Sequence, residues 1–321
     1  MTALFTKKGS GKTLAIVDIE SGSVGAALVH LSPQEAPMLF AETRVTLPLM
    51  HTRDADALAR EVERATEEAL LQVSTVATQL RRHDTVSYQG DISRAAVFLA
   101  APWARMHLSG GTADFIEPVR RSTHFTIRAT LGEIPTSFHP LGTAAAHGSV
   151  LLFPDSGATI ICIVGAEVSE LILVSEYKVV GRATIPLGSH ALLRTLISHS
   201  GMSPAEARSF VSLPRSQHDE LHEPLRIAGD DFALQIEDAA RDLMGLATLS
   251  GVLVVAHEPA AELIARALTR NQTLAEIFPD GGVVRAARSS HAMPFIAAHA
   301  KNPDLHLMLE ALFVDAKFGG I

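Results

Sequence analysis

The residues best suited to chemistry form a short acidic, glycine-containing segment near the N-terminus. The segment reads Asp18-Ile19-Glu20-Ser21-Gly22-Ser23 and follows an apolar run. A carboxylate at the end of a strand, followed by small hydroxyl and glycine residues, can place backbone N–H groups around a phosphate while Asp18 holds hydrated Mg²⁺. Ser21, Gly22 and Ser23 are therefore candidate phosphate-binding residues. An ordinary hairpin, in which Gly22 supplies a positive φ, is the alternative interpretation.

A second turn later in the chain has the same place between two apolar runs. It reads Val164-Gly165-Ala166-Glu167-Val168-Ser169. Two such turns facing one another would form a phosphate clamp, which makes Gly165, Ala166 and Glu167 candidate site residues. The second turn carries Val164 where the first carries Asp18, so the carboxylate for Mg²⁺ comes from the first turn.

The elements that must position these turns occur twice in the same order. Apolar runs and helical periodicity predict, in the first half, strands at 13–19, 23–31 and 39–47, a helix over about 54–82 and a buried strand at 95–101. In the second half they predict strands at 158–164, 169–174 and 178–185, a helix over 189–200, a long helix over about 230–250 and a strand at 251–256. TIM barrels and Rossmann folds place a helix after nearly every strand, so this order excludes both. Two unrelated α+β modules remain the alternative.

The segments 14–19 and 161–167 resemble the two phosphate motifs of the actin-like ATPase superfamily, which also contains the sugar kinases. The segment 165–207, with its Ile185-Pro186-Leu187-Gly188 turn, is similar to the bacterial branch that holds the pilus assembly protein PilM and the division protein FtsA. The resemblance implies an α/β fold of two RNase H-like lobes around an interdomain nucleotide cleft. It also implies that Gly188 borders the phosphates and that Ala256 and His257 occupy the adenosine motif.

Two departures from the family pattern concern nucleotide chemistry. The second phosphate motif of the family carries an Asp where this chain has Val164, and its adenosine motif carries a glycine pair where this chain has Ala256 and His257. Glycines let the nucleotide lie against the backbone, whereas these residues put side chains there. We therefore expect a degenerate cleft in which ATP with Mg²⁺ binds weakly or not at all, and in which hydrolysis is absent or very slow.

The resemblance also implies a domain plan. We expect a flexible basic tail over 1–12, a first lobe over 13–150 and a second lobe over 151–300. A C-terminal helix within 301–321 is expected to pack back on the first lobe. The stretch 106–148 falls where the family inserts a subdomain, and its shortness predicts a reduced version of that insertion.

Composition narrows the function classes. The net charge is −8, which argues against general nucleic-acid binding because that needs a basic face. No run reaches the roughly 18–20 apolar residues of a membrane span, and the polar N-terminus is no signal peptide, so we expect a cytoplasmic protein. Lys7, Lys8 and Lys12 are compatible with peripheral association at the cytoplasmic face of the inner membrane.

The expected function is that of an assembly or scaffold protein of PilM or FtsA type. Its partner would be a protein, such as the tail of a pilus-type or division-type membrane protein, and homo-oligomers are compatible with this role. The alternative is an active ATP-dependent kinase or ATPase, in which Asp18 would be catalytic and Glu167 would be the carboxylate that the second turn offers. A superfamily member that binds a small metabolite in the cleft is a third hypothesis.

Overall fold

Two mixed β-sheets, each covered by helices, form the part of the chain that the computed structural model describes. This part comprises residues 11–33, 35–49, 55–82, 91–106, 113–154, 157–211, 222–244, 249–257, 260–270 and 282–319. Nearly all of the expected N-terminal tail lies outside these residues. Among the described helices, none combines the length and the apolarity needed to cross a membrane.

The first sheet has the strand order β13-β3-β2-β1-β4-β7. Its strands are β1 (Lys12–Ile19), β2 (Ser23–Leu31), β3 (Met38–Thr46), β4 (Ile92–Leu99), β7 (Thr136–Pro140) and β13 (Ala297–Ala298). Strand β1 runs antiparallel to β2 and parallel to β4, and it is buried from its second residue to its last. An almost uninterrupted apolar run is what a strand covered on both faces requires.

The second sheet repeats this arrangement with the order β10-β9-β8-β11-β12. Its strands are β8 (Thr159–Val164), β9 (Ser169–Ser175), β10 (Lys178–Ile185), β11 (Gly251–Val255) and β12 (Val283–Ala286). Strand β8 is antiparallel to β9 and parallel to β11, as β1 is to β2 and β4. The two motif-bearing strands, β1 and β8, are thus interior strands of separate sheets, as expected for a fold of two lobes.

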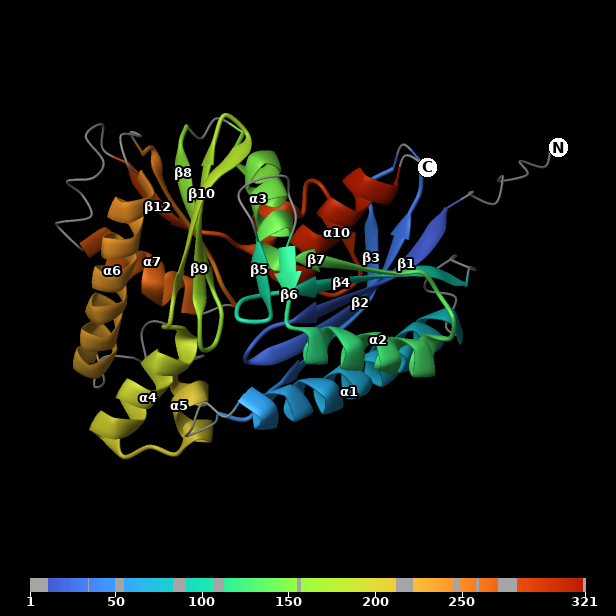
Figure 1. Ribbon diagram of the computed structural model, residues 1–321, viewed down its shortest axis with the longest axis horizontal. Coiled ribbons are helices and arrows are strands. Elements are labelled where there is room, and N and C mark those ends of the chain that lie inside the picture. Colours follow the sequence, from blue (N-terminus) through green and yellow to red (C-terminus); the bar gives the residue numbers. More distant parts are fainter. Residues whose placement is uncertain are drawn as a thin grey trace.

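The helices form layers on these sheets (Figure 1). Helices α1 (Ala55–Arg82) and α2 (Glu117–Leu131) pack together, and α1 covers β2 and β3. On the second sheet, α6 (His222–Met244) contacts β9 and β10, α7 (Ala260–Arg270) contacts β11 and β12, and α4 (Ser189–Ser200) lies against α6 and the short α5 (Pro204–Val211).

A shared helical layer joins the two sheets. Helix α3 (Leu141–Leu152) contacts β8 and β9, while α10 (Leu305–Phe318) contacts β1, β2 and α3. Figure 1 shows both helices in the region between the sheets. One buried cluster contains Leu141 and Leu309 from these helices together with Ile161 and Leu253 from the second sheet. The last helix of the chain therefore helps to hold the sheets together.

Two segments differ from the expected element order. Residues 117–152 form α2, β7 and α3, and β7 pairs with β4, so most of the stretch 106–148 is built into the layers of the first sheet. The short β5 (Ala104–Met106) and β6 (Ala113–Phe115) form a separate two-stranded ribbon. Helix α6 begins at His222 rather than near Asp230, because a proline is tolerated in the first turn, where an N–H lacks a helical partner.

Burial in the second core should make one phenylalanine far more important for stability than an exposed one. Phe232 is fully buried in the core of the second sheet, whereas Phe125 on α2 is 69% exposed. We expect Phe232→Ala to lower the free energy of unfolding by about 3–5 kcal/mol, since it removes buried surface and leaves a cavity. The matched control Phe125→Ala should change it by less than about 0.5 kcal/mol. Urea unfolding followed by circular dichroism measures both, and equal losses would contradict the assigned core.

Candidate functional site

The turn between β1 and β2 and the turn between β8 and β9 are in direct contact. The hydroxyl of Ser21 accepts a hydrogen bond from the backbone N–H of Glu167 at 3.0 Å. A Cβ placed on Gly22 would lie 2.2 Å from the Cβ of Ala166, so Gly22 allows the two turns to approach this closely. The two turns of the predicted phosphate clamp therefore touch, and at Ser21, Gly22, Ala166 and Glu167 no space is left between them.

The backbone of the second turn is closed off by helix α4. The N–H groups of Ser189 and His190 donate to the carbonyls of Gly165 and Ala166, each at 2.9 Å. Gly188 permits this contact, since a Cβ there would come within 2.3 Å of the carbonyl oxygen of Ala166. A helix N-terminus offers its first N–H groups to anions. In this chain two of these N–H groups, those of Ser189 and His190, are already bonded to carbonyls of the second turn.

Glu167 is also occupied. Its carboxylate accepts from His190 Nδ1 at 2.9 Å and from Arg194 Nη1 at 2.9 Å and Nη2 at 2.5 Å. Burial raises the pKa of Glu167, but the hydrogen bonds from His190 and Arg194 outweigh it and lower the pKa to about 2. An ionised carboxylate that is held by an imidazole and a guanidinium and has so low a pKa is a weak proton acceptor, which makes it poorly suited to serve as a general base near neutral pH.

Asp18 is engaged by a guanidinium. Asp18 is fully buried at the end of β1, and Arg44 on β3 donates to its Oδ2 from Nη2 at 2.6 Å. Burial raises the pKa of Asp18 and Arg44 opposes that effect, leaving a pKa of about 6. Arg44 also donates from Nη1 to the hydroxyl of Ser23 at 2.9 Å. The cation beside the predicted Mg²⁺-binding carboxylate is thus a side chain of the protein.

Arg44 extends the network to the C-terminal helix. Its Nε donates to Asp304 Oδ2 at 2.6 Å. Asp304 caps α10, because its Oδ1 accepts from the N–H groups of His306 and Leu307. Burial raises the pKa of Asp304, but the Arg44 charge outweighs it and the net pKa lies well below its usual range. Asp304 therefore joins β3 to the shared helical layer.

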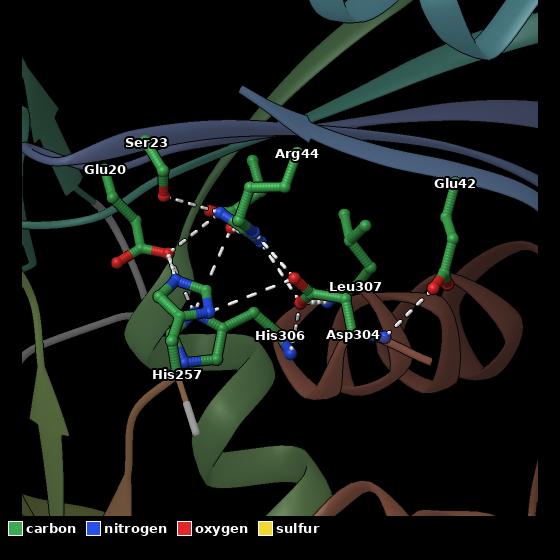
Figure 2. Close-up of polar contacts among 9 residues, drawn as sticks. Glu20, Ser23, Glu42, Arg44, His257, Asp304, His306 and Leu307 are labelled. Carbon is green, nitrogen blue, oxygen red and sulfur yellow. Dashed lines mark hydrogen bonds and ion pairs between the residues drawn. The ribbon is translucent and has the colours of Figure 1, made fainter. Parts of the chain in front are cut away.

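The carboxylate of Glu20 is contacted by two imidazoles and by the guanidinium of Arg44 (Figure 2). Its Oε1 lies 2.7 Å from His257 Nε2, 2.9 Å from His306 Nδ1 and 3.2 Å from Arg44 Nη1. The two imidazole rings lie against each other, with centroids 4.3 Å apart. Burial raises the pKa of Glu20, and the charges of His257 and His306 more than reverse this, so the pKa lies well below its ordinary value. His257 follows β11, so this contact joins the second sheet to the first.

The structure brings most of the expected site residues together at the two turns. Val164 and Ala256 point away from the turns, and His257 points toward the first turn. Val164 and Ala256 are both buried within the apolar core of the second sheet. Since successive side chains of a strand point to opposite faces, a carboxylate at position 164 would enter that core in this arrangement. His257 turns toward Glu20.

Four residues of the network were not among the site residues expected from the sequence: Glu20, Arg44, Asp304 and His306. Arg44 lies on a strand whose sequence resembles an ordinary half-exposed strand. A polar signal did exist in α10, where His306 and Glu310 interrupt a run of apolar residues and are both fully buried. Buried ionisable residues in an apolar helix indicate a polar site nearby.

Comparison with known proteins supports the assignment of the fold. No family model and no curated protein sequence matches the chain. Among solved structures, the PilM–PilN type IV pilus biogenesis complex matches with a TM-score of 0.62 and 12% identity, covering 95% of each chain. The ethanolamine utilization protein EutJ from Carboxydothermus hydrogenoformans gives 0.59 and 15% identity, covering 94% of this chain and 90% of that one. A ROK family glucokinase from Streptomyces griseus, in complex with glucose and AMPPNP, gives 0.52 and 14%, covering 93% and 98%.

The two sheets, their strand order and these matches define the class: the chain is an α/β protein with the actin-like ATPase fold. PilM and EutJ are two structures of that fold to which the similarity extends over nearly the whole chain, with TM-scores near 0.6. At these identities the likeness concerns the fold, and function has to be argued from the site.

Arg44 should be a stability determinant. Its side chain is 15% exposed and contacts three carboxyl groups, so Arg44→Met leaves buried negative charges without a partner. We expect this change to lower the free energy of unfolding by about 3–5 kcal/mol. The control Arg64→Met removes ion pairs to Glu61 and Glu68 from a side chain that is 53% exposed, and should cost less than about 1 kcal/mol. Urea unfolding of both variants decides the comparison.

The raised pKa of Glu42 should make the stability of the folded protein depend on pH. Its Oε1 accepts from the N–H of Asp304, and burial raises the pKa of Glu42 from 4.5 to about 7. The folded protein holds this proton more tightly than the unfolded chain, so the stabilisation from this group is complete below about pH 4.5 and is lost as the pH rises through about 7. Glu42→Gln is neutral throughout, so wild type should lose melting temperature relative to the variant between about pH 5 and about pH 8. A difference that is constant with pH would contradict the raised pKa.

Proposed function

We propose that this chain is a PilM-like assembly or scaffold protein whose nucleotide cleft does not hydrolyse ATP. The observation that carries the proposal is the occupied state of the first phosphate turn. Asp18 is bonded to Arg44 at 2.6 Å, and Ser21 is bonded to the opposing turn through Glu167. A catalytic site would need that carboxylate and that turn for Mg²⁺ and phosphate.

A nucleotide could enter between the two turns only by breaking hydrogen bonds that join them, and its phosphates would then lie near carboxyl groups. Opening the space between the turns breaks the Ser21–Glu167 and Glu20–His257 hydrogen bonds. It also brings a polyanionic ligand toward Asp18, Glu20 and Asp304, three carboxyl groups arranged around one guanidinium. Like charges at short range are costly in a buried site, so ATP binds weakly or not at all.

Hydrolysis fails for a separate reason. Phosphoryl transfer depends on a positioned Mg²⁺ and on a group that orients the attacking nucleophile. Val164 packs into the core of the second sheet, and Glu167 is held by His190 and Arg194. The second turn therefore presents no carboxylate that is ready for this task. The alternative function, an active kinase or ATPase, requires these contacts to be rebuilt.

Adding MgATP tests this proposal directly. We expect the wild-type protein to release no phosphate above background and to show no rise in melting temperature, because a ligand that binds the folded state must stabilise it. Malachite-green detection of phosphate and differential scanning fluorimetry measure the two quantities. Asp18→Asn serves as the matched variant. Turnover of several ATP per second by wild type, lost in Asp18→Asn, would establish the enzyme in place of the scaffold.

The proposed binding activity is directed to a protein. The PilM structure named above is a complex with PilN, which supports a protein partner for a chain of the same fold. We propose the tail of a pilus-type or division-type membrane protein at the cytoplasmic face of the inner membrane. In the first lobe, Ile116 and Phe125 at α2 are exposed large apolar residues, at 48% and 69%, and they offer such a tail an apolar contact.

The partner face can be tested without disturbing the core. Phe125→Asp should abolish co-purification with a pilus-type or division-type membrane protein, since a charge replaces an exposed apolar contact. The matched control Leu234→Asp changes a residue on α6 that is 55% exposed, and binding should be unchanged. Co-expression followed by affinity purification measures the complex. Retention of the partner by Phe125→Asp would place the interface elsewhere.

A further inference from the structure

Glu20, His257 and His306 bring three potential metal-ligand atoms together. Glu20 Oε1, His257 Nε2 and His306 Nδ1 all lie within 4.8 Å of one another. They come from three distant parts of the chain: the β1–β2 turn, the short segment after β11 and the first turn of α10. Figure 2 shows both imidazole rings pointing toward the Glu20 carboxylate. The potential ligands do not include Asp18, the neighbouring carboxylate that the sequence suggested for hydrated Mg²⁺.

The donor set selects a class of metal. Two imidazole nitrogens and one carboxylate oxygen match Zn²⁺ and similar divalent transition metals, whereas Mg²⁺ and Ca²⁺ prefer oxygen ligands alone. Three protein ligands leave a further coordination position for water. His257 is 36% exposed along its side chain, so the cluster can be reached from solvent, while His306 and Glu20 are buried.

Two buried atoms at the cluster indicate that its polar requirements are not met by the protein alone. His306 Nε2 and Asp18 Oδ1 have no hydrogen-bond partner among the described residues, although both side chains are fully buried. His306 Nδ1 lies 3.9 Å from the other oxygen of Asp18. Native proteins pair most buried polar atoms, so the unpaired Asp18 Oδ1 points to an unfilled polar position beside the cluster. A metal bound at His306 Nδ1 leaves Nε2 as the nitrogen that carries the ring proton.

Charge and outer contacts favour a cation at the same place. Asp18, Glu20 and Asp304 surround Arg44, so three carboxyl groups and one guanidinium lie beside the two imidazoles. A divalent ion would take the place of the imidazole protons that face Glu20. Asp304 Oδ2 lies 3.9 Å from His257 Nδ1. A carboxylate near the second nitrogen of a ligating histidine orients the ring and fixes its tautomer. Arg44 keeps its 2.6 Å contacts with Asp18 and Asp304 when Glu20 turns to a metal.

We propose that Glu20, His257 and His306 form a binding site for Zn²⁺ or a similar divalent transition metal, and that the metal locks the cleft in its closed form. His257 Nε2 and His306 Nδ1 release to solvent the protons that they share with Glu20, and the two nitrogens and Glu20 Oε1 bind the metal instead. The metal ties the first phosphate turn to the end of β11 and to the C-terminal helix. This site goes beyond the proposed scaffold function and stands whether or not a protein partner binds.

The test uses the full chain after treatment with a chelator. Titration with ZnCl₂ by isothermal calorimetry should give one tight site, and CoCl₂ should give the visible absorption of a low-coordinate Co²⁺ site with nitrogen and oxygen ligands. His257→Gln removes the most exposed ligand and should weaken Zn²⁺ binding at least tenfold. The matched control His124→Gln alters an exposed histidine on α2 and should bind as wild type does. Since the chain has 15 histidines, this control separates the site from surface binding.

A second measurement keeps the result independent of folding defects. Zn²⁺ should raise the melting temperature of wild type and of His124→Gln, because it binds the folded state, and should leave that of His257→Gln unchanged. MgCl₂ should have no such effect on any of the three. Absence of Zn²⁺ binding to wild type, or equal binding by His257→Gln, would overturn the proposal. The ATP experiments are unaffected by either outcome, so the two proposals fail separately.

Discussion

The buried guanidinium of Arg44 is the constraint on which the closed cleft depends. An arginine with a 15% exposed side chain must be paired, and Arg44 is paired with carboxyl groups from β1, from the β1–β2 turn and from the start of α10. The planar guanidinium has enough donors to contact all three. Its geometry therefore fixes where the first phosphate turn and the C-terminal helix lie relative to β3.

The same interaction underlies the proposal that the cleft binds nucleotide weakly or not at all. In the actin-like architecture the two strand–turn–strand units face each other, and the space between them is the natural place for phosphates. Here Ser21 bonds to the opposing turn and Gly22 lies against Ala166, while the β1 carboxylate has an arginine as its cation. The fold preserves the arrangement and the side chains change what it can do.

The C-terminal helix supplies several of the side chains that surround the first turn. Helix α10 lies in the layer between the sheets, is capped by Asp304 and presents His306 to Glu20. Glu310, one turn further along, is fully buried, and burial raises its pKa well above the usual value. A helix that is otherwise apolar thus places ionisable groups where two lobes meet, an arrangement suited to coupling the lobes to a bound ion.

The sequence by itself determined the two sheets, their central strands and the turns that face each other. Apolar runs and turn residues are local signals, and Asp18, Gly22, Gly165 and Glu167 could be found from them. Only the tertiary structure decided that Arg44 pairs with Asp304, 260 residues away, and that Glu20 meets His257 and His306. It also decided that Val164 and Ala256 lie in a core. Periodicity encodes which residues are buried, but the partner of a buried charge depends on how distant elements pack, and no local pattern records that.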